Sequence, residues 1–74
     1  MYGNVYAVQT YYGSDKPSLI QYYARLTNAK KAAKKRSESH VVSKSEVCLV
    51  NAVYTLDDGV LLACFKNGQL QREV

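Results

Sequence analysis

Apolar and polar side chains alternate in two segments near the start of the chain. Residues 4–12 are rich in β-branched and aromatic types and end at Gly13, which is typical of a strand followed by a turn. Residues 19–26 also carry apolar side chains at every second position. We therefore predict a β-hairpin formed by residues 4–12 and 19–26.

A helical pattern competes with the strand pattern in the second segment. The apolar residues of 19–26 also fit helical spacing, and Pro17 suits the first turn of a helix. One long helix from Pro17 is therefore an alternative. Thr27 favours the hairpin, because threonine is a preferred helix N-cap and an unfavourable residue inside a helix. We predict a separate helix over residues 28–38.

This helix has one apolar stripe, formed by Ala29, Ala32 and Ala33. Alanines allow the helix backbone to lie close to a sheet. Four lysines are predicted to project into solvent on the other side: Lys30, Lys31, Lys34 and Lys35. Arg36 is predicted to lie in the last turn, where a cation is favourable to the helix dipole.

The second half of the chain predicts a three-stranded meander. Asp58-Gly59 and Asn67-Gly68 are strong signals for two-residue type I′ turns. These turns predict that Asp57 pairs with Val60 and that Lys66 pairs with Gln69. One sheet face would then carry Cys48, Val50, Ala52, Tyr54, Leu56, Leu61, Ala63, Phe65, Leu70 and Val74. Cys48 and Cys64 would lie on opposite faces, which excludes a disulfide between them.

The elements combine into one α+β domain over residues 1–74, with a single helix packed on an antiparallel sheet in the order ββαβββ. The long-helix alternative would give βαβββ. A chain of 74 residues supports one thin core.

Charge is concentrated in the predicted helix. The net charge is +4, and five of the ten cations lie within residues 30–36. Like charges four residues apart cost a helix about 0.2–0.5 kcal/mol per pair. A field of this kind suits an anionic partner, and the alternative interpretation is a solvated helix face.

Several classes of protein are disfavoured. No stretch approaches the roughly 18 apolar residues of a membrane span, and no secretion signal opens the chain, so we expect a complete cytosolic protein with reduced cysteines. His40 is the only histidine, and zinc-like spacing is absent, so we expect no metal and no cofactor.

Catalytic groups are also scarce. His40 is expected to be a solvated loop residue, and Asp57 and Asp58 are expected to serve turn geometry. Cys48 and Cys64 are interpreted as small buried apolar residues. We therefore predict a protein that is not an enzyme.

Two pairs of adjacent tyrosines favour a binding function. One member of each pair, Tyr11-Tyr12 and Tyr22-Tyr23, must face away from the core of a sheet. Aromatic side chains beside cations suit nucleic acid or a protein that handles it. We assign Tyr12 and Tyr23 to the contact surface together with the five cations.

The segment Leu26-Thr27-Asn28-Ala29-Lys30-Lys31-Ala32-Ala33, placed between a hairpin and a meander, resembles the small phage-encoded type I anti-CRISPR proteins of ββαβββ fold. The resemblance implies a phage protein that docks on the crRNA-guided surveillance complex and prevents hybridisation of target DNA. It also implies that Lys30 and Lys31 match the family's functional lysines. The tyrosine pairs and Lys34-Lys35-Arg36 have no counterpart in that match.

The sequence thus predicts a small non-enzymatic inhibitor that binds a nucleic-acid-handling complex, with a CRISPR effector as the suspected partner. Two alternatives stay open. The first is a direct, nonspecific DNA- or RNA-binding protein. The second is a homodimeric accessory module, in which a partner subunit covers the half-apolar second face of the sheet.

Overall fold

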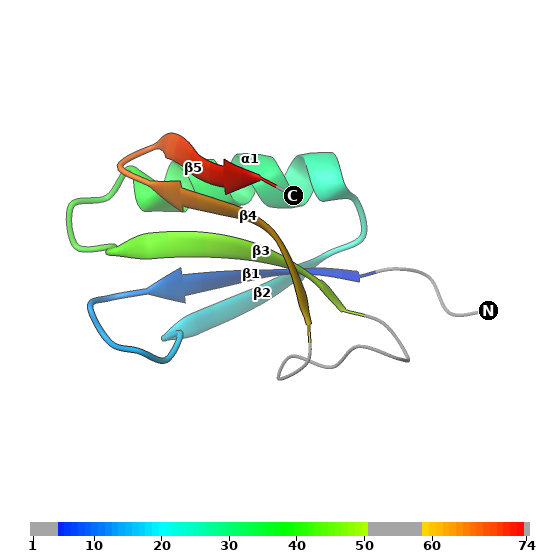
Figure 1. Cartoon of the computed structure of the whole chain (residues 1–74), viewed down its shortest axis with the longest axis horizontal. Coiled ribbons are helices and arrows are strands. Elements are labelled where there is room, and N and C mark those ends of the chain that lie inside the picture. Colours follow the sequence, from blue (N-terminus) through cyan, green and yellow to red (C-terminus); the bar gives the residue numbers. More distant parts are fainter. Residues whose placement is uncertain (1–4, 51–58, 74) are drawn as a thin grey trace.

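One antiparallel sheet of five strands, covered on one face by a helix, makes up the fold (Figure 1). It is seen in a computed structural model that describes residues 5–50 and 59–73. The elements along the chain are β1 (Val5–Tyr11), β2 (Leu19–Tyr23), α1 (Leu26–Ser37), β3 (Lys44–Val50), β4 (Val60–Lys66) and β5 (Gln69–Glu73). The strands lie in the order β2-β1-β3-β4-β5. The predicted α+β fold of order ββαβββ is confirmed.

The first hairpin also confirms the interpretation of residues 19–26 as beginning with a strand. β2 pairs with β1 from Thr10 opposite Leu19 to Tyr6 opposite Tyr23, so the long helix from Pro17 is wrong. The strand ends earlier than predicted, at Tyr23, because the helix begins sooner.

Helix α1 begins at Leu26, with Arg25 at the N-cap position, and the predicted cap at Thr27 is wrong. Arg25 makes no side-chain capping bond, and its carbonyl accepts the Ala29 N–H at 3.1 Å. Thr27 is exposed in the first turn. Leu26 packs against the core, so burial of this leucine outweighs the local preference of threonine for a cap.

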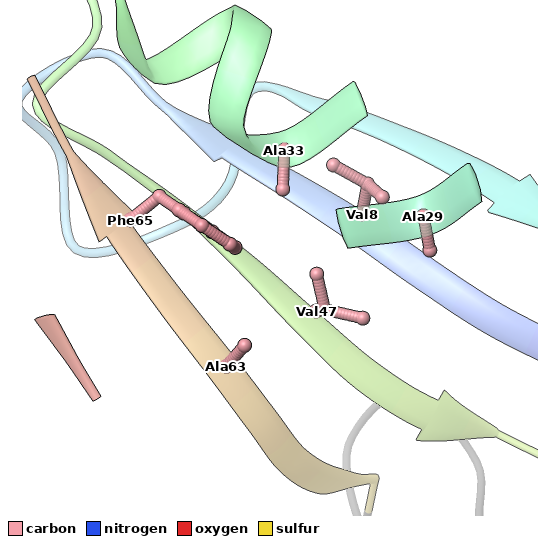
Figure 2. Close-up of a cluster of buried hydrophobic side chains, with 6 residues drawn as sticks. All are labelled: Val8, Ala29, Ala33, Val47, Ala63 and Phe65. Atoms are coloured by element: carbon pink, nitrogen blue, oxygen red, sulfur yellow. The ribbon is translucent and has the colours of Figure 1, made fainter. Parts of the chain in front are cut away.

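The core lies between α1 and the middle strands. Val8 and Val47, opposite each other on β1 and β3, are fully buried, as are Ala29 and Ala33 on the helix. Ala63 and Phe65 of β4 complete this cluster, and Figure 2 shows the side chains of the helix alanines next to those of the sheet residues. Only Phe65 among the six is large, so the core is as thin as the chain length predicts.

The turn between β4 and β5 is as predicted. Lys66 pairs with Gln69, and both turn residues have positive φ, 54° at Asn67 and 74° at Gly68, as a type I′ turn requires. The Gly68 N–H donates to Ser37 Oγ at 3.0 Å, which ties the turn to the end of the helix.

The predicted register between β3 and β4 is wrong. Val60, for which the turn rule predicted Asp57 as the partner, pairs with Leu49, and Val47 lies opposite Ala63. The turn signal at Asp58-Gly59 is local, whereas this register is favoured by burying Val47 and Ala63 together under the helix. Asp57, Asp58 and the predicted face residues within 51–58 lie outside the described residues, as does Val74.

A β-bulge in β4 changes which residues share a face. Val47 is opposite Ala63 but Cys48 is opposite Leu61, which leaves Leu62 as the extra residue. Cys48 and Leu61 therefore lie on the face away from the helix, although they were predicted to share a face with Ala63.

Both cysteines lie on the sheet face away from the helix, which we refer to as the open face. Their predicted placement on opposite faces is therefore wrong. Cys64 pairs with Glu46, and Cys48 is two residues from Glu46 on the same strand. Diagonal neighbours of this kind are about 7–8 Å apart, at or beyond the limit of about 7 Å between the Cα atoms of a disulfide. Both thiols are free.

A polar cluster around Tyr11 lies on the same open face. The Tyr11 hydroxyl donates to Gln9 Oε1 at 3.2 Å, and Lys44 Nζ is 4.5 Å from the centre of the Tyr11 ring. Burial, followed by the neighbouring Glu46 carboxylate, raises the pKa of Tyr11 from 10.0 to about 12. The folded state therefore favours the neutral phenol.

We expect Gly68→Ala to lower the free energy of unfolding by about 1–2 kcal/mol, because L residues are strained at positive φ. The Cβ added at position 68 would also lie 2.8 Å from Glu38 Cγ. Gly13→Ala is the matched control, since Gly13 has a φ of 87° but no atom within 4 Å of the added Cβ. Urea unfolding should show the larger loss at Gly68, and an equal or smaller loss would contradict the contact.

We expect the Tyr11 phenol to make stability depend on alkaline pH. Below pH 10 the phenol is protonated in both the folded and the unfolded chain, and its contribution to the free energy of unfolding is complete. This contribution is lost as the pH rises toward the folded-state pKa of about 12. The unfolding free energy of the parent should therefore fall more steeply across this window than that of Tyr11→Phe. The unfolding free energy is measured by urea titration at each pH. If it falls equally with pH in the parent and in Tyr11→Phe, Tyr11 is not the group responsible.

We expect mass spectrometry of the protein, prepared without reductant, to find two free thiols. Burial raises the pKa of both Cys48 and Cys64, so iodoacetamide should modify the folded protein more slowly than the unfolded chain. Cys64, the less buried of the two, should react first. Detection of an intramolecular bridge would contradict the strand register.

Candidate functional site

The rotation of α1 decides which of its cations face solvent. Ala29, Ala33 and Ser37, spaced by four residues, are the buried positions of the helix. Lys31, Lys34 and Lys35 lie on the other side and are exposed. We refer to these three as the outer lysines. Residues three and four apart on a helix are about 5–6 Å apart at Cβ, so the outer lysines form one compact cationic patch.

Lys30 does not belong to the exposed patch, so its predicted projection into solvent is wrong. It is half-buried and forms an ion pair with Glu73 of β5. A second bulge explains this contact: Phe65 pairs with Leu70 but Cys64 pairs with Arg72, which brings Glu73 opposite Ala63 on the helix side.

Arg36 is tied to the opposite side of the helix. Its Nε donates to Gln21 Oε1 of β2 at 2.9 Å, and the residue is half-buried. Lys30 and Arg36 thus connect α1 to strands on both edges of the sheet, and the outer lysines make no ion pair with any residue in the described ranges.

A groove lies between the helix and the strand at the β2 edge. It has a volume of about 390 Å³ and is lined by Tyr23, Ala32, Lys35 and Arg36. We refer to it as the α1–β2 groove. The Tyr23 hydroxyl donates to Gln21 Oε1 at 3.4 Å, so one carboxamide oxygen accepts from both the phenol and the guanidinium.

The structure separates the two tyrosines assigned to the contact surface. Tyr23 lies beside Ala32, Lys35 and Arg36, in the second half of the helix. Tyr12 is 45% exposed in the bend that follows β1, at the other end of the hairpin from Tyr23. Of the adjacent pair, Tyr22 is the exposed member and lies on the open face, next to Ala7.

Gln21 and Glu73 contact the candidate site, and the sequence did not reveal either position. Gln21 organises the α1–β2 groove, and Glu73 pairs with Lys30. A glutamine in an edge strand carries no distinctive signal, and the face of Glu73 depends on a bulge that alternation alone does not predict.

No cluster of three or more His, Cys, Asp or Glu side chains that could hold a metal occurs among residues 5–50 and 59–73. His40 is exposed in the loop after the helix, as predicted. The one helix described is too short and too polar to cross a membrane. Free ammonium groups next to an aromatic groove are suited to binding anions.

Comparisons of the chain with protein-family models, with curated proteins and with solved structures find no match.

Proposed function

We propose that the protein acts by binding and not by catalysis, and that the outer lysines dock on the phosphates of a nucleic-acid-handling complex. The observation that supports this is the exposed patch of Lys31, Lys34 and Lys35, which has no ion-pair partner among the described residues. An external anion is the natural complement of such a patch.

The energetics of α1 support the same proposal. Lys31 and Lys35 are four residues apart, which costs the helix about 0.2–0.5 kcal/mol. Lys34, Lys35 and Arg36 lie in the last turn, where the helix dipole favours cations, but Lys31 lies before that turn and gains nothing from the dipole. Lys30 is paired with Glu73, whereas Lys31 has no ion-pair partner among the described residues. The unfavourable charges are therefore better explained by a partner than by the stability of the fold.

The narrower form of the proposal names a CRISPR surveillance complex as the partner. It rests on the resemblance of residues 26–33 to type I anti-CRISPR proteins. In this form the protein is a phage-encoded inhibitor that works in the host cytoplasm and prevents target DNA from hybridising. Lys31 is free to dock at once, whereas Lys30 would first have to leave Glu73.

Direct binding of DNA or RNA is a second candidate. The compact spacing of the outer lysines favours it, because three neighbouring ammonium groups can contact a phosphate backbone without any protein partner. The two candidates differ in their dependence on salt, since contacts to a protein would add apolar and hydrogen-bonded terms that salt does not screen.

We expect the double variant Lys31→Glu/Lys34→Glu to lose binding while staying folded, because both side chains point away from the core. The matched control is Lys16→Glu/Lys66→Glu, which makes the same change in net charge at exposed positions off the helix. Circular dichroism checks the fold. If the helix variant binds or inhibits as well as the parent, the patch is only a solvated face and the proposal is wrong.

The two candidates are separated with purified components. An inhibitor should prevent a type I surveillance complex from shifting its target DNA in a gel, while showing little affinity for the free duplex. A direct binder should bind the duplex alone, with a log–log salt slope of roughly −3 for three phosphate contacts. In both cases Lys31→Glu/Lys34→Glu should lose the inhibition or the binding, and the control Lys16→Glu/Lys66→Glu should keep it.

A further inference from the structure

The α1–β2 groove offers more than charge, because it places an aromatic ring beside two cations. We infer that this groove is a site for a single unstacked nucleotide of a nucleic-acid strand, with the base against Tyr23 and the phosphate on Lys35 and Arg36. This inference rests on the proposed function and specifies its ligand as single-stranded nucleic acid.

The dimensions and lining of the groove fit such a ligand. A volume of about 390 Å³ falls in the range of small-ligand sites, roughly 300–1,000 Å³. Its lining contains the Tyr23 ring, the Ala32 methyl group and two cations, and no carboxylate. Bases stack on aromatic side chains in a largely sequence-independent way, while the anionic backbone needs cations nearby.

The groups that would hold the nucleotide are fixed before it binds. Gln21 Oε1 accepts from Arg36 Nε at 2.9 Å and from the Tyr23 hydroxyl at 3.4 Å. The bond to Nε leaves the two terminal guanidinium nitrogens of Arg36, which make no hydrogen bond to a described residue, available for a phosphate. Holding the ring and the guanidinium in place reduces the entropy lost on binding.

The groove also continues into the exposed patch. Lys35 both lines the groove and belongs to the outer lysines, so a strand with one base in the groove can lay its neighbouring phosphates along Lys31 and Lys34. A duplex could use the outer lysines but not the groove, because the faces of its bases are stacked on one another. The geometry therefore favours single strands over duplexes.

The test compares three fluorescein-labelled probes of equal length by fluorescence anisotropy: oligothymidylate, an abasic strand and a DNA duplex. The abasic strand keeps the phosphates and removes the bases. We expect the parent protein to bind oligothymidylate about tenfold or more tightly than the abasic strand, as stacking of one base predicts. Equal affinities would overturn the inference, and this comparison needs no variant.

Variants then place the effect in the groove. Tyr23→Leu should weaken binding of oligothymidylate by about tenfold and leave the abasic strand unchanged, whereas Tyr23→Phe, which keeps the ring, should retain the preference. Tyr22→Leu is the matched control, because Tyr22 is the adjacent tyrosine on the opposite face and is 55% exposed. A preference lost in Tyr22→Leu but kept in Tyr23→Leu would place the base elsewhere and overturn the inference.

Failure of the inference can be told from failure of the proposed function. If Lys31→Glu/Lys34→Glu weakens all three probes but the parent does not distinguish thymidylate from the abasic strand, the groove inference is wrong and the phosphate-binding patch stands. If the lysine variant has no effect on any probe, the proposed function fails first and the groove inference fails with it.

Discussion

The close contact between two alanines of α1 and two valines of the sheet is the constraint on which the other features depend. Ala29 and Ala33 are fully buried against Val8 and Val47, so the helix lies as close to the sheet as methyl groups allow. Packing at this distance restricts the rotation of the helix, since a lysine stem in place of either alanine would push the helix away from the sheet. The positions of the cations follow from that rotation.

Both flanks of the helix are then held by polar contacts to the sheet. Lys30 reaches Glu73 on β5, and Arg36 reaches Gln21 on β2. A partly exposed ion pair such as Lys30–Glu73 contributes little to stability by itself. The consequence of the two contacts is positional, because they hold Lys30 against β5 and Arg36 at the α1–β2 groove and leave the outer lysines on the exposed surface of the helix.

The sequence predicted those parts of the fold that local signals determine. Asn67-Gly68 specified a turn with two positive φ values, and alternation over 19–23 specified a strand. The register of β3 with β4 depends on burying Val47 with Ala63, a contact between distant segments that a turn rule cannot weigh. The bulges that place Leu61 and Glu73 have no clear sequence signal, so the groups around Lys30 could not be predicted either.

The hydrogen bonds from Tyr23 and Arg36 to Gln21 also make the α1–β2 groove more rigid than the outer lysines. Lysine side chains lose rotamer entropy when they are held in one geometry, so the outer lysines are adaptable and suit phosphates at varied positions. The groove is different, because Gln21 holds both Tyr23 and Arg36 before any ligand arrives. An adaptable patch gives affinity with little selectivity, whereas a fixed ring and guanidinium can discriminate between ligands. Since Lys35 belongs to both, selectivity in the groove and affinity on the outer face would act on the same bound strand.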